Sequence, residues 1–256
     1  AQTAQTRIYQ NPYAIGLGYS ADKKLKQLKV LYDQPLTYQT NWLNAATGSA
    51  NTTKYFYAAN FNEVVFQNTK KQTNLTGAFF KKTDLAKPAQ IIFKFTPETD
   101  DPYYLTLGAS LDGDSATWYL GSKEYPYYKT FRHTVVLNPT VSGSDDEVVI
   151  TAKFKKNSLW LENFVLYRMD RSLVEQKLKQ LQKNSWQLTK ATAHRLTGKI
   201  DITKSNQLFA TTIPYSKGWQ AKVDGKPVKT YKIQDTFVGF DISQGKHQVT
   251  LTFTPP

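Results

Sequence analysis

The sequence contains no cysteine in its 256 residues. This absence excludes a disulfide framework, a thiolate zinc site and a cysteine nucleophile. With 40% hydrophobic and 14% aromatic residues, the chain can instead bury a core that needs no cross-links. A secreted protein without cysteine also fits the outside of a Gram-positive cell.

Long apolar runs are lacking as well. No stretch approaches the roughly 20 apolar residues that a membrane-spanning helix needs, and the N-terminus lacks the order of a signal peptide. The sequence opens with Ala1 rather than Met and stops at Pro255-Pro256, directly after a strand-like run. We therefore expect a soluble piece of a longer protein.

Catalytic motifs are lacking too. The sequence has no G-x-S-x-G, H-E-x-x-H, Walker or G-x-G-x-x-G motif. His133, His194 and His247 each lie in a strand-like run, which favours packing over metal binding or base catalysis. Acidic pairs such as Asp100-Asp101 lack EF-hand spacing and are more typical of solvated turns than of calcium sites. We expect no catalytic residue, cofactor or metal.

The pattern that is present is mainly β. Short runs rich in Tyr, Phe, Val, Ile and Thr alternate with turn residues. In residues 147–154, for example, Val148, Ile150, Ala152 and Phe154 fall on one face, as in a sheet with one buried face. Residues 1–170 are therefore predicted to form a jelly-roll-like β-sandwich that begins with extended segments.

A linking helix and a smaller sandwich are predicted to follow. Residues 171–185 have helical periodicity, with Leu178 and Leu181 on one side and a capping box at Ser172 and Glu175. Residues 186–256 contain six strand-like runs, which predict a small Ig-like antiparallel sandwich. Asp224-Gly225 lies between two of these runs and suits a type I′ hairpin.

Positive charge is concentrated near the C-terminus. The net charge is +13, and from Arg171 onward the chain has 14 Lys and Arg but only 5 Asp and Glu. Such a surface suits anionic lipid headgroups or a phosphate-bearing wall polymer, although scattered lysines also simply keep a domain soluble. Nucleic acid is disfavoured, because no Arg/Lys-rich block or RNA-binding motif is present. The candidate polyanion-binding residues are Lys217, Lys222, Lys226, Lys229 and Lys232.

Aromatic residues cluster between positions 103 and 128. Exposed rings on a β-sandwich can stack on sugars, whereas alternate rings on strands usually fill the core. The candidate sugar-stacking residues are Trp118, Tyr119 and Tyr127.

Two segments resemble a known family. Ile213-Pro214-Tyr215-Ser216-Lys217-Gly218-Trp219, then Val223-Asp224-Gly225-Lys226 and Gly245-Lys246-His247, are similar to the C-terminal "IPY-x-x-GW", "VDGK" and "G-x-H" elements of the YfhO family. Near the N-terminus, Asn11-Pro12-Tyr13-Ala14 with Gly16-Leu17-Gly18, then Gln39, Asn41 and Gly48, resemble its "NPYALPLG" and "QN-x-L-x-x-A-x-x-G" segments, apart from one missing Pro.

We interpret the C-terminal motif as scaffold rather than active site. Trp219 is expected to be buried against the small sandwich, after a close turn at Gly218. The structural residues are Pro214, Tyr215, Gly218, Trp219, Asp224 and Gly225.

The resemblance implies a polytopic membrane protein with a glycosyltransferase-C-like membrane region, to which this chain would be an extracytoplasmic accessory domain. Some family members are implicated in glycosylating teichoic acid from a polyprenyl-phosphate sugar, and no catalytic residue can be carried over. The expected partners are the protein's own membrane helices, the anionic membrane surface, and the teichoic acid or polyprenyl-phosphate sugar. Both chain ends, Ala1 and Pro256, would then face the membrane. The alternatives are an autonomous carbohydrate-binding module and a ligand-free structural domain.

Overall fold

The computed structural model describes residues 11–72, 78–108, 116–125, 134–139 and 146–255. Strands hold 49% of these residues and helices 14%, so the mainly β prediction is confirmed. Ala1, Pro256, Tyr127 and His133 lie outside the described residues. Within the ranges that the structure describes, all strand pairs are antiparallel, and they form five sheets.

The chain folds into two compact units. We call Leu31–Thr40 with Lys54–Arg171 the central unit, and the described parts of Ala1–Val30, Asn41–Thr53 and Ser172–Pro256 the C-terminal unit. The expected division at residues 170 and 186 therefore differs from the observed one, because N-terminal segments join the C-terminal unit. The two α-helices in the described residues are α1 (Pro35–Thr47) and α2 (Arg171–Lys183).

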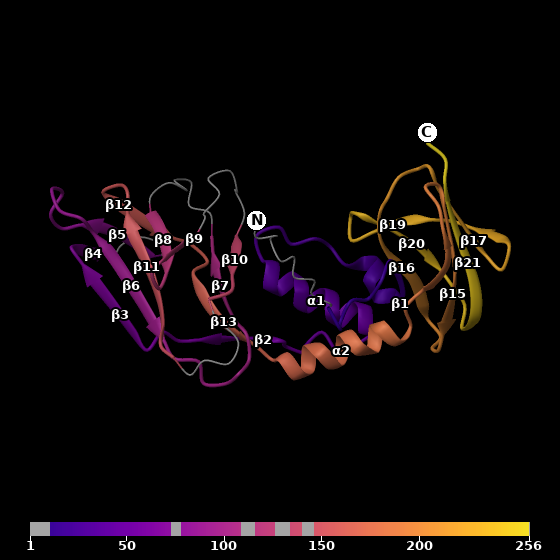
Figure 1. The fold of residues 1–256 in the computed structure, drawn as a ribbon, viewed down its shortest axis with the longest axis horizontal. Helices are drawn as coiled ribbons and strands as arrows, with labels where there is room; N and C mark the ends of the chain where they lie inside the picture. Colours follow the sequence, from indigo (N-terminus) through magenta and orange to yellow (C-terminus); the bar gives the residue numbers. More distant parts are fainter. Residues whose placement is uncertain (1–10, 73–77, 109–115, 126–133, 140–145, 256) are drawn as a thin grey trace, which may run out of the picture. The chain divides into compact units, whose positions relative to one another are not determined.

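The central unit is a β-sandwich (Figure 1). Its three sheets have the strand orders β3-β6-β11-β8-β9, β10-β7-β13-β2 and β12-β5-β4. The strands are β2 (Phe56–Ala59), β3 (Glu63–Gln67), β4 (Thr69–Gln72), β5 (Ala78–Lys82), β6 (Gln90–Phe95), β7 (Tyr103–Leu107), β8 (Ala116–Leu120), β9 (Lys123–Tyr125), β10 (Val135–Leu137), β11 (Val148–Phe154), β12 (Ser158–Leu161) and β13 (Val165–Met169).

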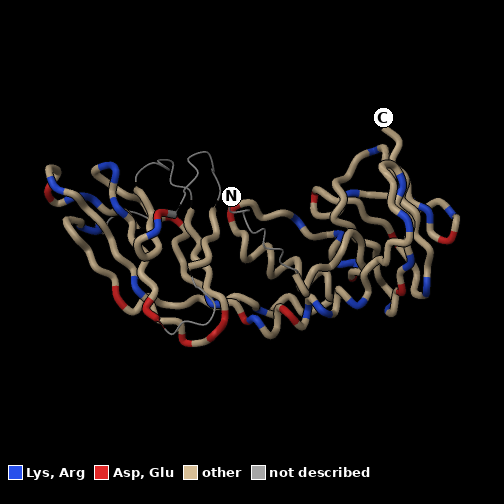
Figure 2. The backbone as a smooth tube through the Cα atoms, in the orientation of Figure 1, with Lys and Arg blue, Asp and Glu red and all other residues tan. Residues whose placement is uncertain are grey.

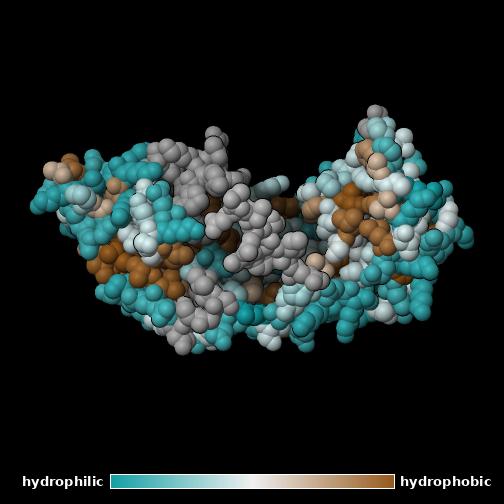
Figure 3. Space-filling view, viewed as in Figure 1, coloured by the Kyte–Doolittle hydropathy of each residue, from teal (hydrophilic) through white to brown (hydrophobic). Residues whose placement is uncertain are grey.

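Aromatic side chains fill the core of the central unit. The ring of Phe164 lies 4.6 Å from that of Phe93 and 5.7 Å from those of Phe61 and Trp118. At the edge strand β3 this core reaches the surface, because Val64 and Phe66 point to the core side yet are 37% and 49% exposed. Figure 3 shows hydrophobic residues gathered over this part of the unit.

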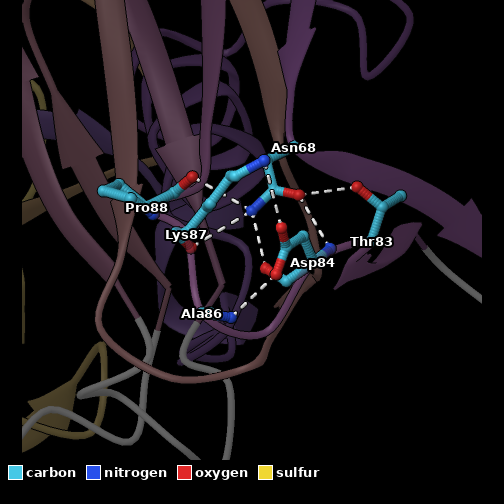
Figure 4. A network of polar contacts seen from close by, with 6 residues as sticks. All are labelled: Asn68, Thr83, Asp84, Ala86, Lys87 and Pro88. Carbon is cyan, nitrogen blue, oxygen red and sulfur yellow. Dashed lines mark hydrogen bonds and ion pairs between the residues drawn. The ribbon is translucent and has the colours of Figure 1, made fainter.

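A polar corner fixes the loop between β5 and β6 (Figure 4). Asn68 has a φ of 52°, a conformation that Asn tolerates better than most residues. Its Nδ2 donates to the carbonyl oxygens of Asp84, Lys87 and Pro88, and its Oδ1 accepts from Thr83 Oγ1 and the Asp84 amide. One side chain thus satisfies the backbone of the turn that links two sheets.

The C-terminal unit contains the smaller sandwich. Its two sheets have the orders β1-β16-β20-β19 and β14-β15-β21-β17-β18. The elements are β1 (Gly18–Asp22), the 3-10 helix η1 (Lys23–Gln27), β14 (Gln187–Ala191), β15 (Arg195–Ile202), β16 (Gln207–Pro214), β17 (Trp219–Val223), β18 (Lys226–Val228), β19 (Tyr231–Ile233), β20 (Phe237–Asp241) and β21 (Gly245–Phe253). Phe209 and Phe240 stack at its centre, with ring centroids 4.7 Å apart.

The strand β1 was not anticipated in this sandwich. It pairs with β16 over five residues, from Gly18↔Thr211 to Asp22↔Gln207. Leu208, Phe209 and Ala210 of β16 are fully buried, so their backbone groups need hydrogen-bonding partners on both sides. An N-terminal strand supplies those partners.

The helix α2 begins at Arg171, one residue before the predicted capping box. Ser172 therefore lies inside the first turn, and the Arg171 amide is satisfied from elsewhere, by Asp101 Oδ1 at 3.2 Å. The Asp101 carboxylate also pairs with Arg168. This acidic pair, Asp100-Asp101, thus includes a residue that holds the helix terminus.

Gly18→Ala should destabilise the protein by about 1–3 kcal/mol, because the new Cβ would lie 2.7 Å from the buried ring of Phe209. The measurement is urea-induced unfolding. Leu17→Ala, in the same segment but 42% exposed, is the control and should cost less than about 0.5 kcal/mol. Equal midpoints for the two variants would contradict the packing of β1 on Phe209.

Candidate functional site: a basic sheet face

The outward side of the sheet β14-β15-β21-β17-β18 carries five cations. Side chains alternate along each strand, and directly paired residues share a face. The burial pattern of β15 places Ile200 and Ile202 inward and Lys199 and Asp201 outward. We call the outward set the basic face; by register it comprises Gln187, Lys190, Arg195, Thr197, Lys199, Asp201, Gln220, Lys222, Pro227, Lys246, Gln248, Thr250 and Thr252.

The basic face is polar apart from Pro227 on the edge strand β18. It has five cations, Lys190, Arg195, Lys199, Lys222 and Lys246, and one carboxylate, Asp201; the other residues are Gln and Thr. Within the described part of the chain none of the five cations has an ion-pair partner. In Figure 2, Lys and Arg likewise outnumber Asp and Glu along the C-terminal strands. The face therefore presents uncompensated positive charge to solvent.

Register places the cations in rows across the strands. One row runs Lys190–Thr197–Thr250–Lys222 over four strands, and its two threonine hydroxyls lie 3.3 Å apart. Neighbouring strands lie about 4.8 Å apart, so the two lysines at its ends are separated by roughly 14 Å at the backbone. The two residues between them are threonines, of which Thr197 is buried.

The structure disperses the five lysines expected from the sequence. All are exposed, but only Lys222 belongs to the basic face. Lys226 begins β18 at the hairpin, Lys217 and Lys229 lie in loops, and Lys232 is on β19 of the other sheet, with its Nζ 5.7 Å from the Tyr215 ring centroid. Sequence reasoning missed the other four cations of the face, for which period-2 alternation in residues 195–201 and 246–252 was the available signal.

The sugar-stacking residues do not form a ring platform. Trp118 is only 4% exposed and packs in the core, which corrects its assignment as a stacking residue. Tyr119 is half-buried, and the Lys153 ammonium lies 4.4 Å from its ring centroid. Among the described residues, therefore, no open pair of these rings is available to a sugar.

The family-like motifs meet in the C-terminal unit as scaffold. Asp224 and Gly225 have φ values of 49° and 80°, as the predicted hairpin between β17 and β18 requires. Asp224 Oδ2 lies 2.7 Å from His247 Nδ1, and Asp224 Oδ1 accepts from the Gln248 amide at 2.8 Å. The "VDGK" and "G-x-H" segments are therefore two halves of one contact, which fastens the hairpin to β21.

Both ring nitrogens of His247 face acceptor oxygens. Nδ1 faces the Asp224 carboxylate, and Nε2 lies 3.0 Å from the Ser243 carbonyl oxygen. The Ser243 hydroxyl lies 3.3 Å from the same Nε2. The hydrogen bond from His247, and then that from the Gln248 amide, hold the pKa of Asp224 below its ordinary value.

The remaining motif residues also support the fold. Gly218 is required because a Cβ there would lie 2.2 Å from the Thr254 carbonyl oxygen. The Tyr215 amide donates to the Thr236 carbonyl at 2.7 Å, while Pro214, before it, is exposed. Gly245 has a φ of 131°. It leads from β20 in one sheet to β21 in the other, so it lies at a crossover between the two sheets.

Trp219 is half-buried, which corrects the expectation of a buried ring. It is the first residue of β17, and it pairs with Phe253, the last residue of β21, so it packs where the core ends. The two rings lie 5.0 Å apart. The buried tryptophan of this sandwich is Trp186, which is 4% exposed.

Trp186→Ala should therefore destabilise the fold by about 3–5 kcal/mol, and Trp219→Ala by clearly less, because only the first leaves a large core cavity. Thermal unfolding monitored by circular dichroism compares the two. A larger loss for Trp219→Ala would place that ring in the core after all.

The Asp224–His247 contact predicts a pH dependence of stability. Because the folded-state pKa of Asp224 is lowered, the contact stabilises the fold above the ordinary carboxyl pKa of 3.8, and this contribution is lost as pH falls through the folded-state pKa. Asp224→Asn keeps a residue suited to the turn but removes the charge. Its melting temperature should fall less than that of the unmodified chain between about pH 5 and about pH 2.5.

Asp235→Asn is the matched control, since Asp235 is exposed and also has a positive φ, of 53°. It should follow the unmodified chain over the whole pH range. If the melting temperatures of Asp224→Asn and Asp235→Asn fell equally as pH was lowered, a stabilising role of the contact would be rejected.

Comparison with known proteins identifies the family. A family model described as "Bacterial membrane protein YfhO" matches residues 1–256. The uncharacterized protein YfhO of Bacillus subtilis (strain 168) is 28% identical over 134 residues, which is 50% of this chain and 14% of that protein. A crystal structure of the conserved protein of unknown function PA5104 from Pseudomonas aeruginosa PAO1 aligns with 76% of this chain and 94% of its own at 10% identity, but its TM-score of 0.19 supports no argument.

The family description refers to a membrane protein, although none of the helices in the described residues is long and apolar enough to cross a membrane. The family model spans the whole of this chain. The chain belongs to the YfhO family of bacterial membrane proteins.

Proposed function

We propose that this chain is an extracytoplasmic accessory portion of a polytopic membrane protein of glycosyltransferase-C type, and that it holds a phosphate-bearing cell-wall polymer such as teichoic acid. The observation that carries this proposal is the basic face, with five unpaired cations against one carboxylate. The donor would be a polyprenyl-phosphate sugar, presented by the protein's own membrane helices.

The chemistry of the basic face suits a linear polyanion. Lysine and arginine at recurring positions create a positive potential that gathers anions and raises their local concentration. The intervening Thr and Gln side chains donate hydrogen bonds to hydroxyl and phosphate oxygens. A flat face with several cations can engage successive phosphates of one chain, so that weak individual contacts combine.

In this proposal the groups that carry out sugar transfer lie outside this chain. In the described residues no group of three or more His, Asp and Glu gathers as a metal site would require. His247, the histidine with the closest carboxylate partner, is engaged through both ring nitrogens. Sugar transfer needs a positioned acid or base, which this proposal assigns to the rest of the protein.

A carbohydrate-binding module is less well supported. Such a module needs exposed rings, and Trp118 is buried while a lysine covers Tyr119. The anionic membrane surface remains a neighbour in this proposal, because a domain tethered by membrane helices stays near lipid headgroups.

Purified teichoic acid should bind the 256-residue chain weakly, and the affinity should fall steeply as salt rises, because exposed charges are screened over about 8 Å at physiological ionic strength. Lys190→Gln/Lys222→Gln should weaken binding several-fold. Lys70→Gln/Lys71→Gln, which removes two exposed lysines from β4 of the central unit, should have little effect. Isothermal titration calorimetry at several salt concentrations makes the comparison.

The five lysines first expected from the sequence provide a second comparison. Neutralising Lys217 and Lys232, which lie off the basic face, should weaken binding less than neutralising Lys190 and Lys222. Affinity that persists at high salt would point to ring stacking, and no binding at all would favour a ligand-free structural domain.

A further inference from the structure

A pocket of about 490 Å³ opens at one end of the basic face. Its walls come from the end of α2, the start of β14, the end of β15 and the start of β21, all in the C-terminal unit. The lining side chains that matter for its chemistry are Lys183, Gln187, Lys199, Asp201, Lys246 and Gln248. Sequence reasoning did not identify this group, because its members lie up to 65 positions apart.

Strand register fixes the arrangement of these side chains. Gln187, Lys199 and Gln248 are direct cross-strand neighbours on β14, β15 and β21. Side chains in such pairs lie about 5 Å apart at Cβ, so an amide flanks the Lys199 stem on each side. Asp201 and Lys246 form the next row. Lys183 reaches the same pocket from the last turn of α2.

The pocket has an excess of positive charge. It collects three ammonium groups and one carboxylate, and within the described residues none of these four groups forms an ion pair. His247 also lines the pocket, with its Nδ1 2.7 Å from the Asp224 carboxylate. Like charges held close together repel one another, and a bound anion removes that cost.

From this geometry we propose that the pocket binds the phosphate group of a phosphodiester polymer. A tetrahedral phosphate offers several acceptor oxygens, which matches converging ammonium and amide donors better than the two oxygens of a carboxylate. The proposal rests on the proposed function and deepens it, because it assigns one phosphate of the polymer to a specific site.

The surroundings of the pocket favour a polymer in water over a lipid headgroup. Surfaces that dock on membranes combine basic residues with exposed apolar side chains that enter the lipid. The basic face has no large apolar side chain by register, whereas it continues from the pocket to Arg195, Lys190 and Lys222. Lys199 and Arg195 lie four residues apart on β15, roughly 13 Å along the strand, so further phosphates of the same chain meet further cations.

The test compares two double variants of the 256-residue chain. Lys199→Gln/Lys246→Gln removes two pocket cations. Lys217→Gln/Lys229→Gln removes the same charge from exposed lysines of the same unit outside the pocket. All four side chains are exposed, so both variants should keep the melting temperature of the unmodified chain, and binding differences then report on the site.

Binding is measured by NMR titration with inorganic phosphate, with a soluble linear polyphosphate, and with vesicles of phosphatidylglycerol in phosphatidylcholine. We expect the pocket variant to lose about tenfold in affinity for both phosphate probes, and the control variant to lose less than about twofold for inorganic phosphate. The shifted amides of the unmodified chain should include those of Gln187, Lys199 and Gln248.

The remaining outcomes contradict the proposal in distinguishable ways. If both variants weaken polyphosphate equally and inorganic phosphate shifts no pocket amide, the pocket is not a site, although attraction of polyanions by net charge would stand. If vesicles bind and polyphosphate does not, the ligand is a membrane surface and the pocket proposal fails. If no probe binds, the proposed function fails together with it.

Discussion

The C-terminal sandwich depends on the pairing of β1 with β16. β16 lies inside its sheet, flanked by β1 and β20, and its central residues are fully buried. Without β1, the buried amide and carbonyl groups along one side of β16 would lack hydrogen-bonding partners. Leaving such groups unpaired would strongly destabilise the folded state. Gly18 permits this pairing, since any side chain there would meet Phe209. Residues from the two ends of the sequence are therefore one folding unit.

The same strand also anchors the residues next to the basic face. Trp186 donates its amide to the Gly18 carbonyl at 2.7 Å, and Ser20 donates to that of Asn184 at 3.0 Å. These bonds hold the segment between α2 and β14 against β1, and Lys183 and Gln187, which line the pocket, flank this segment. The N-terminal motif therefore supports the pocket without adding a side chain to its lining. It acts through backbone hydrogen bonds and the close packing that Gly18 allows.

Local signals in the sequence were sufficient for local structure. The sheet period, the helix near residue 172 and the Asp224-Gly225 hairpin follow from alternation, periodicity and turn chemistry, each of which acts within about ten residues. The position of β1 does not, because pairing between residues 18 and 211 depends on which buried edge needs a partner. Trp118 and Trp219 illustrate a related difficulty: a tryptophan on a strand is compatible with core, rim or ligand contact until the opposite sheet is known. Trp118 proved to be core and Trp219 rim.

The candidate site was harder to predict than the fold because charge was counted along the chain rather than across strands. Lys217, Lys222, Lys226, Lys229 and Lys232 are close in sequence, yet the hairpin at residue 224 and the crossover to β19 send them to different surfaces. Lys199 and Lys246 are 47 positions apart and become diagonal neighbours, because β15 pairs with β21 over eight residues. The charge on a sheet face comes from strands that are distant in sequence. The strand register is therefore needed to determine which lysines lie together on one face. In this protein the residues of the family-like motif set that register, through Asp224, His247 and Gly218. The motif thus acts on the basic face indirectly: it fixes where β17 and β21 lie, and their outward side chains can then vary in chemistry without disturbing the sandwich beneath them.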